Sequence, residues 1–214
     1  MVMMNVAFTE ASMQDNATLV PLMFLIVIVA IGVLLRTITG TISTVVIIIA
    51  SIATTMGLAG WSGLYLTGPS ASAPTMILTL AVADCIHILT TLFYEMRRGV
   101  EKRQALLDSL KLNFQPIFLT SITTAIGFLS MNFSDSPPFH DLGNMVATGV
   151  MLAFLFSITL FPALLSLLPL RVKVRGEEES DLMDRFSGFV INKRNLLLPS
   201  MAAVIVGLSL FVPN

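Results

Sequence analysis

The chain has 214 residues, of which 55% are hydrophobic and only 12% are charged, about half the ~25% of a soluble domain. A soluble fold of this length has too little interior to bury so much apolar surface. The composition therefore excludes an ordinary soluble enzyme, a disordered tail and a nucleic-acid-binding domain, and lipid is the expected solvent. The 12 Lys and Arg nearly balance the 13 Asp and Glu, so net charge indicates no partner.

Apolar runs long enough to cross a bilayer, which takes about 20 residues, recur along the chain. They predict six transmembrane helices, at residues 19–35, 41–66, 73–95, 116–133, 142–169 and 195–212. We expect Pro74 and Pro116 to open the third and fourth of these, at a position where proline is tolerated. The predicted fold class is an all-α integral membrane protein with a bundle of about six transmembrane helices.

The connection between the third and fourth spans contains a segment with amphipathic helical spacing, residues 100–111. Its leucines and its basic residues would suit a short helix lying on the membrane surface. The alternative is a plain linker helix in water, and the sequence leaves both open.

The basic residues orient the bundle, because they lie only in alternate connections. Arg36 follows the first span, five basic residues lie within 97–111, and the remaining six lie within 171–194. Under the positive-inside rule these connections face the cytoplasm. Both chain ends then lie on the opposite side of the membrane.

Asp84 is the one carboxyl group well inside a predicted span. An ionised Asp at the bilayer centre costs about 2.5–3.5 kcal/mol on insertion scales, so such residues normally face the bundle interior and serve a function there. A carboxyl that alternates between neutral and charged forms is suited to carry protons. The alternative is a structural, protonated Asp hydrogen-bonded to a neighbouring helix.

His87 and Thr91 follow Asp84 at helical spacing and are expected to extend the same polar stripe. His87 is a candidate for the proton relay, although a passive role in a polar seam explains it equally well. Candidate polar partners for Asp84 are Thr91 and four residues of the next two spans: Thr123, Thr124, Asn144 and Thr148. One Asp and one His on a helix are too few ligands for a metal, and no cofactor is expected. The single cysteine, Cys85, excludes a disulfide framework.

The chain contains the stretches LAVADCIHILTTLFYEMRRG (80–99), LTSITTAIGFLSMNFSDSPPFHDLG (119–143) and LFPALLSLLP (160–169). These stretches resemble the resistance-nodulation-division (RND) superfamily, and within it the MMPL-type exporters of hydrophobic or amphiphilic molecules. The resemblance covers about residues 8–212. The TSITTAIGFLS segment beside an intramembrane Asp is its most specific part.

The resemblance implies helices two to seven of a twelve-helix transporter. Residues 1–18 would end an extracytoplasmic domain, 19–169 would form a five-helix block like the sterol-sensing domain, 170–194 a cytoplasmic linker, and 195–212 the first helix of the second half. Asp84 matches the family's proton-coupling acid and His87 a histidine of one branch. Cys85 stands where many relatives have an acid or Tyr.

The resemblance implies a non-enzymatic function: the membrane part of a proton-motive-force-driven exporter in a bacterial inner membrane. Its expected partners are membrane lipid, a hydrophobic or amphiphilic substrate, and a second half supplied by the remainder of a longer gene product or by a split gene. A homo-oligomer is a further option, and nucleic acid is not expected. The alternatives are a sterol-sensing-like lipid-binding module and a non-functional fragment.

Overall fold

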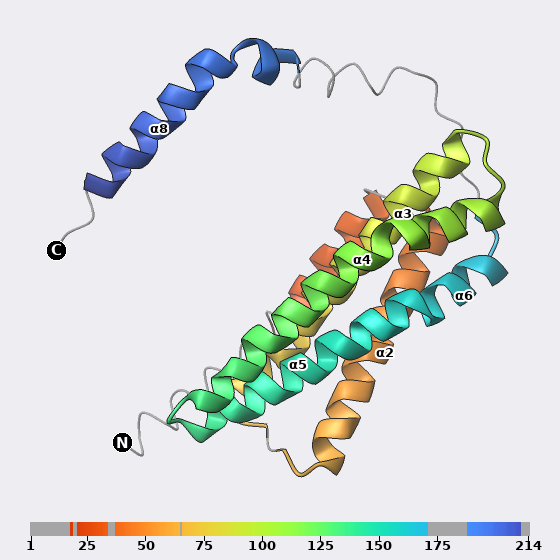
Figure 1. Cartoon of the computed structure of the whole chain (residues 1–214). Helices are drawn as coiled ribbons and strands as arrows, with labels where there is room; N and C mark the ends of the chain where they lie inside the picture. The colour runs from red at the N-terminus through yellow and green to blue at the C-terminus, as the bar shows by residue number, and fades with distance from the viewer. Residues whose placement is uncertain (1–17, 19–20, 34–36, 65, 171–187, 211–214) are drawn as a thin grey trace. The chain divides into compact units, whose positions relative to one another are not determined.

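The computed structural model describes residues 18, 21–33, 37–64, 66–170 and 188–210. The chain forms two compact units, Met1–Val172 and Lys173–Asn214. In the described part of both units all regular structure is helical (Figure 1). This confirms the predicted fold class.

The first unit contains an apolar helix at Pro21–Val33 and a bundle of longer helices. Its elements are α2 (Ile38–Trp61), the 3-10 turn η1 (Ser70–Ser72), α3 (Ala73–Arg97), α4 (Lys102–Leu129), the 3-10 turn η2 (Ser130–Phe133), α5 (Pro137–Ile158) and α6 (Leu160–Leu167). Four stretches are long and apolar enough to cross a membrane: Ile38–Trp61, Ser70–Arg97, Lys102–Phe133 and Pro137–Leu167. They confirm the second to fifth predicted spans, with changed boundaries.

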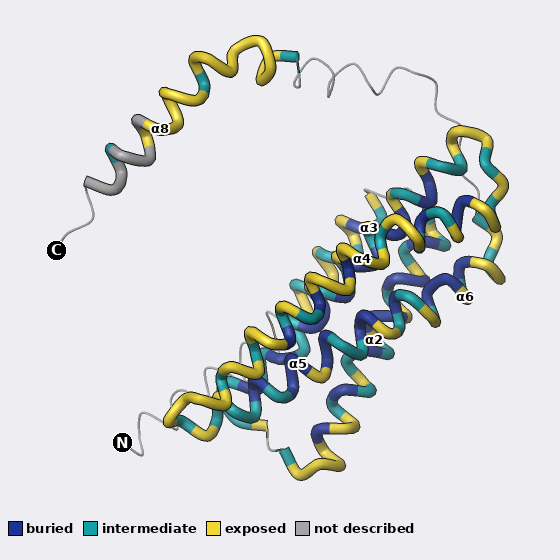
Figure 2. The backbone as a smooth tube through the Cα atoms, viewed as in Figure 1, coloured by how far each residue is buried: buried dark blue, intermediate teal, exposed yellow. Residues whose placement is uncertain are grey.

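Helix α3 lies inside the bundle and packs against α2, α4 and α5. It is the most buried of the four long stretches, whereas α4 is the least buried, as the exposed outer face of α4 in Figure 2 shows. The sequence of α3 explains its position, since apolar or small residues occupy most of one face, including Ile77, Ala81 and Ile88. The helix that carries Asp84 is therefore enclosed on three sides by protein.

Small side chains line the face of α2 that is turned towards the bundle. Thr44, Ser51 and Thr55 are buried, and each hydroxyl donates a hydrogen bond of 2.6–2.9 Å to the carbonyl four residues earlier in α2. Because the helix itself satisfies these hydroxyls, this face packs as a row of small residues. Small residues allow membrane helices to approach closely.

Helix α4 corrects two of the predictions. It begins at Lys102, not at residue 116, and runs through Pro116 as one helix, so the separate amphipathic helix at 100–111 is wrong. The reason is tertiary packing: every fourth residue from Ala105 to Ala125 lies on one inward ridge, which continues past the proline. These ridge residues are Ala105, Ser109, Asn113, Ile117, Ser121 and Ala125. Pro116 itself is exposed and removes a single backbone hydrogen bond.

The fifth predicted span is also interrupted. Helix α5 ends at Ile158 and α6 begins at Leu160, with Thr159 between them at φ −115° and ψ −66°. Pro162 accounts for the break, because its ring would clash with the carbonyl of Ile158 and it lacks the N–H that this carbonyl would accept in a continuous helix. The span therefore bends three residues before the proline.

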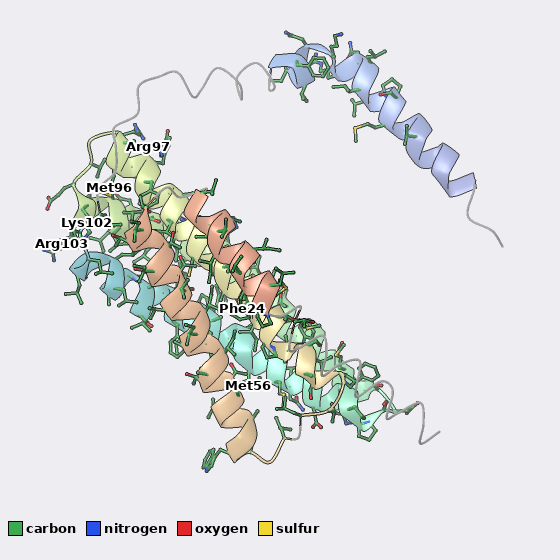
Figure 3. All side chains as sticks on the ribbon, turned by 180° about the vertical axis from the view of Figure 1, so that it is seen from behind. Phe24, Met56, Met96, Arg97, Lys102 and Arg103 are labelled. Atoms are coloured by element: carbon green, nitrogen blue, oxygen red, sulfur yellow. The ribbon has the colours of Figure 1, made fainter. Side chains whose placement is uncertain are left out.

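One end of the bundle, which we term the basic end, consists of residues 97–103 and 166–169. Figure 3 labels Arg97, Lys102 and Arg103 together there, at the turn from α3 to α4. The Lys102 ammonium group donates hydrogen bonds to the carbonyls of Ser166 (3.0 Å) and Leu168 (2.8 Å) at the end of α6. The connections predicted to share one side of the membrane therefore do meet, as far as the described residues extend.

The second unit contains α8 (Arg194–Leu210), whose bounds lie within two residues of the predicted sixth span. Residues 1–17 and 171–187, which hold most of the predicted terminal segment and linker, lie outside the described residues. The proposed domain identities remain predictions.

Candidate functional site

Asp84 lies near the middle of α3 and is buried, with 6% of its surface exposed. It stands at the edge of the inward face, between the buried Ala81 and the buried Ile88 along the helix. An α-helix places residues three and four positions apart on one side, so these neighbours define an apolar surrounding for the carboxyl group. A polar group at such a position is costly without a partner.

Within the described residues, the Asp84 carboxyl group has no hydrogen bond and no ion pair. The only two salt bridges found there join Arg98 to Glu95 and Lys111 to Asp108, both near the basic end. No titratable residue occurs in α2 or in Pro21–Val33; those of α5 lie within its first five residues, and those of α4 end at Lys111. The neighbouring helices therefore bring no counter-ion to the level of Asp84.

Cys85 and Asp84 face different neighbours although they are adjacent in sequence. The Cys85 thiol is fully buried and interacts with the side chain of Thr44 on α2. Successive helix residues are about 100° apart, so Asp84 points away from this contact, towards the α4 side of α3. Cys85 thus belongs to the packing between α2 and α3.

His87 is separated from Asp84 by the structure. Its side chain is exposed and lies on the outer stripe of α3 with Ala83, Thr90 and Tyr94, while Asp84 is buried. Three residues along a helix correspond to about 60° of rotation, which is enough to cross the edge of a buried face. A relay between the two residues stays a prediction, and it requires something to cover His87.

The candidate polar partners lie at several levels of the bundle, and none is hydrogen-bonded to Asp84 in the described residues. Thr123 is exposed and bonds to the carbonyls of Leu119 and Thr120 in its own helix. Thr124 is partly buried and Thr148 is exposed. Asn144 exchanges two side-chain hydrogen bonds with Asn132, at the end of the bundle opposite the basic end.

Thr91 is the candidate that joins a polar contact between helices. Its hydroxyl donates to the His87 carbonyl (3.1 Å) and accepts a hydrogen bond from the Asn113 amide of α4 (2.9 Å). The buried Ser109 of α4 donates to the Ile88 carbonyl (2.7 Å). Sequence reasoning missed Ser109 and Asn113, because the predicted fourth span begins at residue 116, after both of them. Their four-residue spacing with Ile117 is the signal that could have identified them.

The Thr91–Asn113 bond also fixes the level of α4 that Asp84 faces. Asp84 precedes Thr91 by two helical turns, and α4 runs in the opposite direction. About one and two turns beyond Asn113 lie Ile117 and Ser121, the buried residues of that part of α4. The carboxyl is therefore placed against an apolar and hydroxyl-bearing stretch of α4.

The described residues contain no group of three or more His, Cys, Asp or Glu side chains that could hold a metal ion. The chemistry that this arrangement supports is protonation and deprotonation of a single enclosed carboxyl group. Burial of the neutral carboxyl group costs little free energy in such an environment, whereas the charged carboxylate needs a partner or water.

Two similarities to known proteins bear on this chain. The model of the MMPL family matches residues 3–194. The membrane protein MJ1562 of Methanocaldococcus jannaschii is 25% identical over 130 residues, which are 58% of this chain and 34% of that protein. The chain thus spans about a third of the length of this curated relative.

Proposed function

Since this chain belongs to the MMPL family and is a multi-pass membrane protein, we propose that it is the membrane-embedded part of a proton-motive-force-driven exporter of hydrophobic or amphiphilic molecules. Asp84 is the proton-coupling acid of this exporter. The observation that carries the proposal is the position of Asp84: a buried carboxyl on α3, without a hydrogen bond or ion pair among the described residues.

The coupling follows from the cost of charge in this site. When Asp84 is protonated, the bundle tolerates it among apolar neighbours; when it loses the proton, the charge favours a packing that admits water or a counter-ion. A protein with two packings shifts between them by the difference in their free energies. One proton crossing 100 mV supplies about 2.3 kcal/mol, which is enough for a large change in such an equilibrium.

The direction of proton movement follows from the basic end. Clustered Arg and Lys favour the cytoplasmic side, so protons enter from the opposite end of the bundle and leave towards residues 97–103. The corresponding location is a bacterial inner membrane, with both chain ends extracytoplasmic. The family match and the apolar helices support the membrane location.

The exposed polar residues of the membrane spans support the need for a further polypeptide. His87 and Thr90 on α3, and Thr120 and Thr123 on α4, are exposed on two helices that pack against one another. The three threonine hydroxyls donate to carbonyls of their own helices, whereas the exposed His87 imidazole is unfavourable in lipid. This surface is therefore suited to a covering helix that contacts His87. The second half of the transporter, from the same gene product or a split gene, is the proposed occupant.

The test is the Asp84→Asn variant in the complete transporter, which keeps the size of the side chain and removes its titration. We expect proton-dependent efflux to fall to background at unchanged protein level. Asp135→Asn, the same chemical change at an exposed position, is the matched control and should transport normally. Efflux by Asp84→Asn equal to that of the wild type would overturn the proposal and favour a lipid-sensing module.

A further inference from the structure

The contact between α3 and α4 on the basic-end side of Asp84 is held by side-chain hydrogen bonds. We term Thr91, Ser109 and Asn113, with the carbonyls of His87 and Ile88, the Asn113 cluster. The Asn113 amide nitrogen lies 2.9 Å from the Thr91 hydroxyl and 2.8 Å from the Ser109 carbonyl. The Ser109 hydroxyl lies 2.7 Å from the Ile88 carbonyl. Two helices are therefore joined through three side chains.

The donors and acceptors of this cluster can be assigned in only one way. The Ser109 carbonyl accepts only, so the nitrogen of the Asn113 amide must face it. That nitrogen also faces Thr91, whose hydroxyl then donates its own proton to the His87 carbonyl. Each hydroxyl in the cluster is thus committed, and the cluster is a fixed link between the helices.

The cluster binds α3 at the turn that follows Asp84. The carbonyls of His87 and Ile88 belong to the residues three and four positions after Asp84, and both accept an additional side-chain bond. Ser109, Ile88 and Leu92 are fully buried around this contact. Access from the basic end to Asp84 along α4 therefore passes through hydrogen-bonded and close-packed residues.

We propose that Asn113 is a positioning residue for Asp84: it keeps α3 and α4 closed between the carboxyl group and the basic end. A proton on Asp84 leaves towards the basic end only after the Asn113–Thr91 hydrogen bond opens. This rests on the proposed function, in which Asp84 exchanges a proton with that side. Asn113 does not touch the reacting proton, and it acts through the turn that carries Asp84.

The experiment is infrared spectroscopy of the whole 214-residue chain in lipid bilayers. The carboxyl C=O band of protonated Asp84, assigned by its loss in Asp84→Asn, shifts when the proton exchanges with D2O. Loss of one interhelical hydrogen bond lowers the opening free energy by about 1.4 kcal/mol, or tenfold in the open population. We therefore expect exchange in Asn113→Leu to be about tenfold faster than in the wild type.

Three further variants separate positioning from a general loss of structure. Thr91→Val removes the acceptor of the same hydrogen bond and should also accelerate exchange about tenfold, whereas Thr91→Ser keeps the hydroxyl and should exchange like the wild type. Asn132→Leu removes the side-chain hydrogen bonds to Asn144 at the opposite end of the bundle and should not change the rate. If Asn113→Leu does not fold, the difference in exchange rate between Thr91→Val and Thr91→Ser tests the proposal.

Equal exchange rates in the wild type, Asn113→Leu and Thr91→Val would overturn the positioning role, even where Asp84 titrates. A carboxyl band that is absent at every pH, or does not change with pH, would instead overturn the proposed function of Asp84. The two failures are therefore read from different measurements on the same samples.

Discussion

The side chain of Ile77 on α3 occupies the space that a β-carbon on Gly149 of α5 would need. The Thr55 hydroxyl of α2 lies 3.1 Å from the same point, so three helices meet at one glycine. Interiors are close-packed, and a contact of this kind leaves no room for even one methyl group. Gly149 therefore allows α5 to approach α3 and α2 closely.

Substitution Gly149→Ala should destabilise the bundle by about 1–3 kcal/mol, because the added methyl group forces α3 and α5 apart. The measurement is the midpoint of unfolding of the purified chain in a detergent titration. Gly127→Ala is the matched control, since a β-carbon there meets nothing within 4 Å; it should be neutral or stabilising by up to about 1 kcal/mol. Equal midpoints for both variants would show that the α3–α5 contact relaxes freely.

The buried face of α2 should depend on side-chain size and little on polarity. Ser51→Ala is expected to cost less than about 1 kcal/mol, because the hydroxyl bonds only to the Ile47 carbonyl of its own helix. Ser51→Leu should cost more, about 1–3 kcal/mol or above, through overpacking. Ala53→Leu, on the exposed side of α2, is the control for added volume and should be neutral. The same detergent titration ranks the three, and a larger loss for Ser51→Ala than for Ser51→Leu would contradict the packing argument.

Lys102 should stabilise the end of α6. Lys102→Met keeps the aliphatic stem but removes both hydrogen bonds to the carbonyls of Ser166 and Leu168. Because the ammonium group is partly exposed to solvent, the expected loss is modest, about 1 kcal/mol. Backbone deuterium exchange should increase in α6 and remain unchanged in α2. Arg103→Met alters the neighbouring exposed cation and should leave exchange in α6 as it is; an identical increase would attribute the effect to charge alone.

The two reciprocal hydrogen bonds between the side-chain amides of Asn132 and Asn144, at 2.9 and 3.1 Å, should appear as a coupling free energy in a double-mutant cycle. Both side chains are at least partly exposed, so we expect a coupling free energy of only about 0.5–1 kcal/mol between Asn132→Ala and Asn144→Ala. The readout is the midpoint of thermal unfolding of the two single variants and the double variant. Strict additivity would mean that water replaces these bonds without loss.

The α-helical fold and most of the spans could be predicted from the sequence because hydropathy is a sum over neighbouring residues. The limits of the fourth and fifth spans could not. Pro116 is a helix breaker by local rules, yet α4 continues through it because a ridge of inward residues lies on both sides. Pro162 has the opposite outcome and separates α5 from α6.

For the candidate site, the sequence predicts Asp84 itself but not its surroundings. A lone Asp in an apolar span marks Asp84 without any knowledge of its neighbours. The rotation that buries Asp84 and exposes His87, and the pairing of Thr91 with Asn113, depend on how α3 meets α4. Spacing along one helix specifies angles within that helix, but it does not specify which side a neighbouring helix covers.

The sequence alone thus determined the solvent, most of the membrane-crossing segments, the clustering of basic residues and the presence of one acid among apolar residues. The tertiary structure decided which face of each helix is buried, which residues of α4 reach α3, and that Asp84 has no partner among the described residues. The physical reason is that transfer to lipid depends on local composition. Contacts between helices depend on the matching of surfaces that lie far apart in the sequence.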